Sequence, residues 1–193
     1  QGSTGRTVLA RIETDRVGYM HSFAVTPSYV ILVEPPLYVD LRSLLNPFAG
    51  GSFMDALSWR PDEHSRFLVI DREDGRVVTT VEGPPFFYFH QANAFDTAEG
   101  VTLDMVTFDD ASVIDALTLD DLRTGAFSHP MGDLTRFSVS VDQGSLDRET
   151  LHAGHLSLPR INEQRRTRAY EYVFAQGATG SNRIDFPTGL RKV

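Results

Sequence analysis

The amino-acid sequence predicts an all-β fold, and three observations support this prediction. Short apolar segments recur along the whole chain, and residues typical of turns separate them. The step Asp74-Gly75 stands between two such segments and is typical of a β-hairpin, because that turn needs a positive φ. Between the strand segments, residues 109–124 break the pattern and suggest a short helix. Short helical insertions in a β protein are therefore expected.

The strand pattern appears in ten segments of the chain. We expect strands at residues 8–13, 19–25, 29–33, 66–71, 76–81, 86–90, 101–108, 134–141, 151–158 and 169–175. Within residues 109–124, Asp110 can cap a short helix whose apolar residues include Val113 and Ile114. No linker of different composition divides the chain, so we expect residues 1–193 to belong to a single domain.

Composition and charge exclude several classes of protein. The net charge is −8 and the pI is near 5.1, which argues against a nucleic-acid-binding surface. The absence of cysteine excludes disulfides, thiolate nucleophiles and zinc sites built on cysteine. The longest apolar stretch, residues 29–39, is interrupted by Glu34 and two prolines and is too short to span a bilayer. We expect a cytoplasmic protein.

Two histidines stand in segments that look alike. His21 lies in the apolar segment 19–25, and His90 ends the aromatic segment 86–90. A polar ring at a buried strand position needs a partner, and two such rings from separate hairpins could share one metal ion. Alternatively, both are core histidines whose nitrogens are satisfied by backbone hydrogen bonds.

The other histidines are weaker candidates. His155 could face inward, and spacing alone would allow it to form a trio with His21 and His90. Exposed or loop positions are expected for His64, His129 and His152.

Paired strands at this spacing fit either a β-sandwich or a β-propeller. A propeller blade takes about 40–50 residues, so the chain would supply about four blades. The recurring histidine hairpins favour the propeller, because the innermost strands of successive blades all face one central axis. This geometry brings residues that are distant in the sequence to one point.

Three stretches together resemble the carotenoid cleavage oxygenase family, which includes stilbene-cleaving enzymes and the retinoid isomerase of the visual cycle. They are residues 19–37, residues 86–95 and residues 158–162, and the intervening residues 66–72 also match. The stretches occur in the order of the family and at about its spacing.

The resemblance implies a seven-bladed β-propeller whose axis carries Fe(II) held by four histidines. By this likeness His21 is the second ligand and His90 is the third, whereas His155 falls on no ligand position. The first and fourth ligands would lie outside the chain. We therefore expect residues 1–193 to be a partial propeller domain, truncated at both ends, and a central fragment of the enzyme.

The resemblance also implies an activity. The expected enzyme is a non-haem iron(II)-dependent dioxygenase that uses O2 to cleave a carbon–carbon double bond of a carotenoid, apocarotenoid or stilbene-like substrate, giving carbonyl products. Its substrate is an apolar conjugated small molecule, and Phe23, Phe89 and Phe95 are expected to line the substrate tunnel. Regions outside the chain would make peripheral membrane contact. This fragment alone should be inactive.

One position departs from the family pattern. Ser157 stands where family members commonly carry a Glu that accepts a hydrogen bond from the third ligand. A hydroxyl can accept that bond but carries no charge, and losing such a carboxylate weakens metal binding. Two alternatives therefore stay open: an isomerase with the same fold and iron, and a non-catalytic β-propeller that serves as a binding module.

Overall fold

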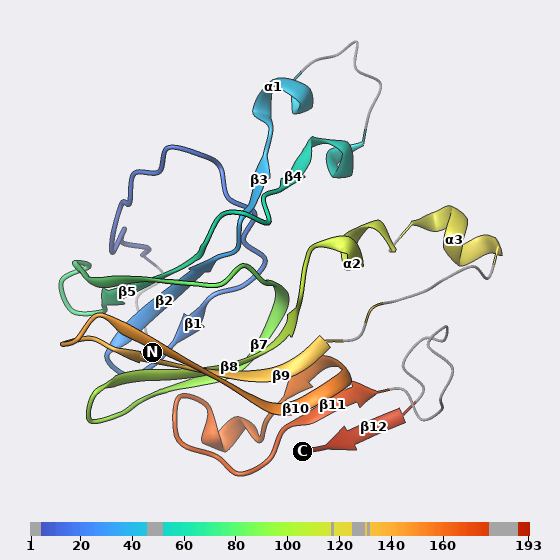
Figure 1. Ribbon diagram of the computed structural model, residues 1–193. Helices are drawn as coiled ribbons and strands as arrows, with labels where there is room; N and C mark the ends of the chain where they lie inside the picture. Colours follow the sequence, from blue (N-terminus) through green and yellow to red (C-terminus); the bar gives the residue numbers. More distant parts are fainter. Residues whose placement is uncertain (1–4, 46–51, 117, 125–129, 131, 178–188) are drawn as a thin grey trace.

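The computed structural model describes residues 5–45, 52–116, 118–124, 130, 132–177 and 189–193, and Figure 1 draws the chain. Within this part, three antiparallel sheets account for the strands, and all helices are short. The prediction of an all-β fold with short helical insertions is confirmed. The number of blades stays a prediction.

Two large sheets form the body of the structure. The four-stranded sheet has the order β1-β2-β5-β6 and the six-stranded sheet has the order β12-β11-β10-β9-β8-β7. The first consists of β1 (Ala24–Val25), β2 (Tyr29–Glu34), β5 (Ser65–Asp71) and β6 (Val77–Gly83). The second consists of β7 (Phe87–Asp96), β8 (Gly100–Phe108), β9 (Gly132–Ser140), β10 (Ser145–Arg160), β11 (Phe174–Gly177) and β12 (Gly189–Lys192).

Smaller elements project from this body (Figure 1). A two-stranded sheet pairs β3 (Leu37–Val39) with β4 (Leu57–Trp59). The helices are α1 (Leu41–Leu44), α2 (Ser112–Asp115) and α3 (Leu119–Thr124), with 3₁₀ turns η1 (Phe53–Ala56) and η2 (Glu163–Arg165). The helix expected within residues 109–124 is thus two short helices, and the Asp110 carboxylate accepts a hydrogen bond from the first residue of α2.

The expected strand at residues 8–13 is wrong. This segment has no strand partner and instead crosses the hairpin between β5 and β6. Gly75 in that hairpin has a φ of +76°, as the Asp-Gly step predicted. A Cβ at Gly75 would collide with the carbonyl oxygen of Leu9, so the glycine also allows the close crossing. The side chains of Val8 and Leu9 are exposed, so the apolar pattern of residues 8–13 does not mark a buried strand.

Two further strands are shorter than expected. Only Ala24–Val25 of residues 19–25 forms a regular strand, because the preceding residues bond to β3 instead, through a bridge between Gly18 and Tyr38. Of residues 169–175, only the last two belong to β11.

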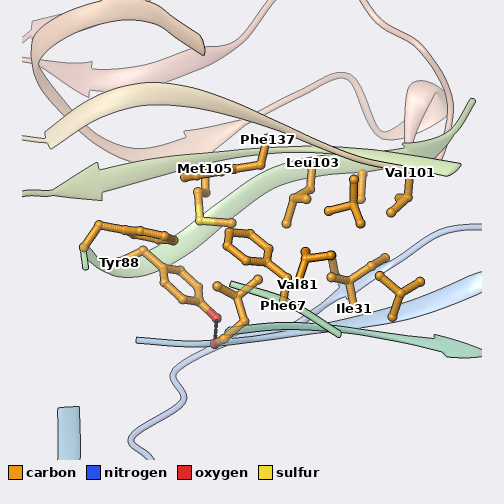
Figure 2. Close-up of a cluster of buried hydrophobic side chains, with 14 residues drawn as sticks. Ile31, Phe67, Val81, Tyr88, Val101, Leu103, Met105 and Phe137 are labelled. Carbon is orange, nitrogen blue, oxygen red and sulfur yellow. Dashed lines mark hydrogen bonds between the residues drawn. The ribbon is translucent and has the colours of Figure 1, made fainter. Parts of the chain in front are cut away.

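The main core lies between the two large sheets, which pack face to face (Figure 2). Alternate residues of β5 and β8 point into it, as period-two strands require. At its centre, the ring centroid of Phe137 lies 5.0 Å from that of Phe67 and 4.9 Å from that of Phe86. Such aromatic contacts add to the free energy gained by burial.

The same packing aligns the edges of the sheets. β1 and β7 are each an edge strand, and they lie against one another. The Tyr88 hydroxyl joins the sheets by donating to the carbonyl oxygens of Val33 and Ser22, at 2.9 and 2.8 Å. The segments that carry the two histidines therefore meet at one place.

We predict that Phe67→Ala lowers the free energy of unfolding by about 3–5 kcal/mol, because it leaves a cavity between the sheets. Phe67 is fully buried, whereas Phe53 is 45% exposed and provides the matched control, Phe53→Ala. Denaturant unfolding of the protein that carries this chain measures both variants. Equal losses in the two variants would contradict the packing described for Phe67.

Candidate metal centre

The rings of His21 and His90 lie together although their segments are far apart in the sequence. Their centroids are 5.0 Å apart and the ring planes are nearly perpendicular, at 86°. His90 is half-buried in β7, whereas His21 is exposed and precedes β1. The expectation of a buried strand position is therefore wrong for His21, because β1 begins only after it.

The spacing of the rings suits a shared metal ion. An imidazole nitrogen lies about 2.1 Å from a bound first-row metal. Two imidazoles that face one ion from neighbouring positions therefore have their centroids roughly 4.5–5.5 Å apart. The observed centroid distance falls within this range. Among the residues that the structure describes, no third His, Cys, Asp or Glu completes a cluster with them.

His21 is held by aromatic neighbours. The hydroxyl of Tyr19 lies 3.2 Å from its Nδ1, and the ring of Phe89 contacts it edge-on with centroids 5.2 Å apart. Tyr19 is itself anchored, since its backbone N–H donates to the carbonyl of Leu37. Burial raises the pKa of Tyr19, so it stays a neutral phenol. When Nδ1 carries the proton and donates it to Tyr19, Nε2 keeps a free lone pair.

His90 is held in its neutral form. Burial lowers its pKa, and the charges of His21 and Arg160 lower it further. A neutral imidazole has the lone pair that a metal ligand needs.

The three phenylalanines expected to line a tunnel lie in different surroundings. Phe89 contacts both histidine rings, and its centroid is 4.8 Å from that of Phe87. Phe23 is 59% exposed and lines a cavity of about 520 Å³ that β1, β7 and the end of β10 enclose. Phe95 packs against Tyr170. The structure thus brings only Phe89 of the three to the histidine pair.

Ser157 lies in β10 and pairs with Gln176 of β11. It is half-buried, and the register of β10 shifts just after it. The next residue, Leu158, has a φ of +48°, which is uncommon for a residue other than glycine. The strand is therefore irregular at the position where the resemblance leads us to expect a Glu.

The remaining histidines lie apart from the pair or outside the described residues. His64 is exposed ahead of β5, as expected. The expectation of an exposed position is wrong for His152, which is half-buried in β10, where it pairs with Leu134. His129 lies outside the described residues, and so does the side chain of His155.

Sequence reasoning missed a buried ion pair behind β7. Asp104 in β8 is fully buried and accepts two hydrogen bonds from Arg136, each 2.9 Å long, and a third from the Tyr170 hydroxyl. Burial raises the pKa of Tyr170, and the charge of Asp104 raises it further. Asp104 alternates with apolar residues in its strand, a pattern that predicts an exposed carboxylate, so the sequence carried no signal of this burial.

We predict that the imidazole of His90 titrates below the ordinary pKa of 6.5 in the metal-free protein. The unfolded chain then binds a proton that the folded chain does not, so the stability contributed by neutral His90 is lost as the pH falls below 6.5. NMR titration of labelled histidine measures this pKa. Replacing Arg160 by Gln should raise it, and a His90 pKa above 6.5 would refute the assignment of a neutral ring.

Comparison with known proteins agrees with the geometry. The family model described as RPE65, retinal pigment epithelial membrane protein, matches residues 2–193. Carotenoid cleavage dioxygenase 8 homolog A, chloroplastic, of Oryza sativa subsp. japonica is 31% identical over 209 residues, covering 100% of this chain and 37% of the relative. Carotenoid-cleaving dioxygenase, mitochondrial, of Mustela putorius furo is 35% identical over 117 residues, covering 60% of this chain and 22% of the relative.

Solved structures show the same fold. Cobalt-substituted Synechocystis ACO superposes with a TM-score of 0.77 at 22% identity, covering 91% of this chain and 36% of that chain. An ACO/RPE65 chimera superposes with a TM-score of 0.74 at 21% identity, covering 92% of this chain and 36% of that chain. The chain therefore spans well under half the length of the relatives that it matches. Since the family model covers nearly every residue, the chain belongs to the family of RPE65 and the carotenoid cleavage dioxygenases.

Proposed function

We propose that the protein carrying this chain is an iron(II)-dependent dioxygenase that cleaves a carbon–carbon double bond of a carotenoid, apocarotenoid or stilbene-like substrate. The products are two carbonyl compounds, and O2 is the second substrate. The observation that carries the proposal is the meeting of the His21 and His90 rings at the joined edges of two sheets. The names of the relatives support the reaction class.

His21 and His90 would hold the iron. Imidazole nitrogens suit iron among the first-row metals, and the centroid distance of the two rings fits a shared ion. A solved structure with the same fold, Synechocystis ACO, is described as cobalt-substituted, and this supports the proposal of a bound metal ion. When bound, the ion supplies the electron chemistry that activates O2. The protein's part is to keep the His90 ring neutral and to orient both rings.

The aromatic residues around the pair would exclude water and guide an apolar substrate. Phe89 packs against both histidines and against Phe108, which limits access to the rings from one side. Phe23 and Phe95 remain proposed tunnel residues. A rigid conjugated molecule suits such a lining, because ligand sites are mostly apolar with a few placed polar groups.

We also propose that residues 1–193 are one partial domain of a seven-bladed propeller. Its first and fourth iron ligands would come from other parts of the polypeptide. No helix in the described part of the chain is long and apolar enough to cross a membrane. A cytoplasmic location with peripheral membrane contact through other regions stays a prediction, and two of the relatives bear mitochondrial and chloroplastic names.

Isomerisation is the second candidate function. The matching family model takes its description from RPE65, and a Drosophila melanogaster relative that is 36% identical over 104 residues is named carotenoid isomerooxygenase. Product analysis with and without O2 separates the two activities. Carbonyl products that form only in O2 identify cleavage, whereas a rearranged product of unchanged mass identifies isomerisation.

A non-catalytic binding module is the third candidate, and Ser157 favours it, because a hydroxyl replaces the family's carboxylate. Elemental analysis of the protein that carries this chain tests it directly. Stoichiometric iron is expected from the oxygenase, and metal-free protein that still binds carotenoid would identify the binding module.

We predict that His90→Ala abolishes both stoichiometric iron and carbonyl product, because it removes the half-buried ligand. Elemental analysis and product assays measure the two effects. The matched control is His64→Ala, which replaces an exposed histidine outside the pair and should leave iron content and turnover unchanged. Full activity of His90→Ala would refute the proposed centre.

We predict that Ser157→Glu tightens metal binding about 10–100-fold, because a carboxylate that accepts the ligand's ring N–H orients the ring and strengthens it as a donor. Metal titration followed by elemental analysis measures the affinity. Ala153→Glu adds the same charge at an exposed position of β10 and is the control. The same gain in both variants would mean that overall charge, rather than the position of Ser157, sets the affinity.

A further inference from the structure

The strand that carries His90 is irregular at this histidine. The partners across β7 and β8 are Tyr88 with Thr107, Gln91 with Met105, and Asn93 with Asp104. β7 therefore advances by three residues where β8 moves by two, and then by two residues where β8 moves by one. Two bulges thus follow one another within residues 88–93. Bulges of this kind re-aim side chains and are common next to active sites.

The bulges explain where the His90 ring lies. In a regular strand, His90 would share the face of Phe86 and Tyr88, both of which point into the core between the sheets. Its ring instead lies next to that of His21 at the edge of the sheet. The extra residues shift the alternation of side chains and so turn the imidazole away from the core.

A buried asparagine fixes the far end of the bulged stretch. Asn93 is only 8% exposed, and its Nδ2 donates to the carbonyl oxygens of Arg168, at 2.9 Å, and Arg165, at 3.4 Å. Its Oδ1 accepts a hydrogen bond of 3.0 Å from the N–H of Thr167. Both ends of the amide are therefore used, and β7 is tied to residues 165–168.

The loop of residues 165–168, to which the Asn93 side chain bonds, has an unusual backbone conformation. Thr167 has a φ of +64°, which is rare for a β-branched residue and is energetically unfavourable. Such a backbone conformation persists only where contacts with the surrounding structure hold the residue in it. The hydrogen bond from Thr167 to Asn93 supplies part of this constraint.

The neighbouring strand supplies a firm support for Asn93. Its partner across the ladder is Asp104, which the buried ion pair with Arg136 holds in place. Tyr170, which also bonds to Asp104, lies just beyond the loop that Asn93 holds. Two adjacent polar residues, one on each strand, thus anchor the segment after β10.

From these contacts we infer that Asn93 is a positioning residue for His90. It holds the end of the bulged stretch, so that the His90 ring stays opposite that of His21. Asn93 itself touches neither ring and acts through the backbone of β7. The expected effect of Asn93 on metal affinity rests on the proposed function, whereas its effect on the position of the His90 ring does not.

The test compares Asn93→Ala with Asn162→Ala in the protein that carries this chain. Asn162 caps η2 in the same loop, where its side chain accepts from the N–H of Gln164, so its loss loosens the loop without cutting a bond to β7. Cobalt(II) titration measures affinity, and crystal structures of the metal-free proteins give the distance between the His21 and His90 rings. Asn93→Asp, which keeps the acceptor for Thr167, is a milder second variant.

We expect Asn93→Ala to weaken cobalt binding about 10-fold or more, in the range found for residues that orient ligands. The His90 ring should also leave its place beside His21. Asn162→Ala should change the affinity by less than twofold, and Asn93→Asp should fall between the two. If Asn93→Ala does not fold, the affinity and ring placement of Asn93→Asp decide the question.

Two results would overturn the inference. One is an unmoved ring and unchanged affinity in the Asn93 variants, and the other is an equal loss in Asn162→Ala, which would assign the effect to the loop as a whole. Failure of the parent protein to bind cobalt would count against the proposed function. In that case the ring placement in the metal-free variants still decides the role of Asn93.

Discussion

The face-to-face packing of the two large sheets is the constraint on which the rest of the structure depends. Phe67 from one sheet and Phe137 from the other meet at its centre and exclude water from the space between them. Apolar burial supplies most of the stabilisation available to two sheets that pack in this way. Because the sheets pack in one relative position, the edge strands β1 and β7 also have one relative position, and the two histidine rings meet as a consequence.

Hydrogen bonds then fix the alignment of the two histidine segments that the packing of the apolar core brings together. Ser22, next to His21, donates from its hydroxyl to the carbonyl oxygen of Phe89, while its own carbonyl accepts from Tyr88. These two bonds join the segments on either side of the candidate centre. Hydrogen bonds of this kind are worth about 1 kcal/mol each, yet an unsatisfied partner would cost more, so they specify the alignment of the segments.

The surroundings of His90 favour a neutral imidazole, which is the protonation state that a metal ligand needs. Burial and nearby positive charge lower the pKa of His90, and the ring of Phe89 contacts both histidines. Asn93 and Asp104 lie behind this region, on the side of the segment that follows β10. The histidine pair therefore has aromatic contacts, and the hydrogen bonds of Asn93 and Asp104 stabilise the two neighbouring strands and the segment after β10.

The amino-acid sequence by itself determined the strand alternation, the Asp74-Gly75 turn, the two histidine segments and the family. These are local patterns of burial and turn chemistry that a short stretch of chain carries. The crossing of residues 8–13 over Gly75, the double bulge at His90 and the bonds of Asn93 were decided by the tertiary structure alone. Each depends on a partner far away in the chain, and periodicity reports that a residue is buried without reporting what buries it.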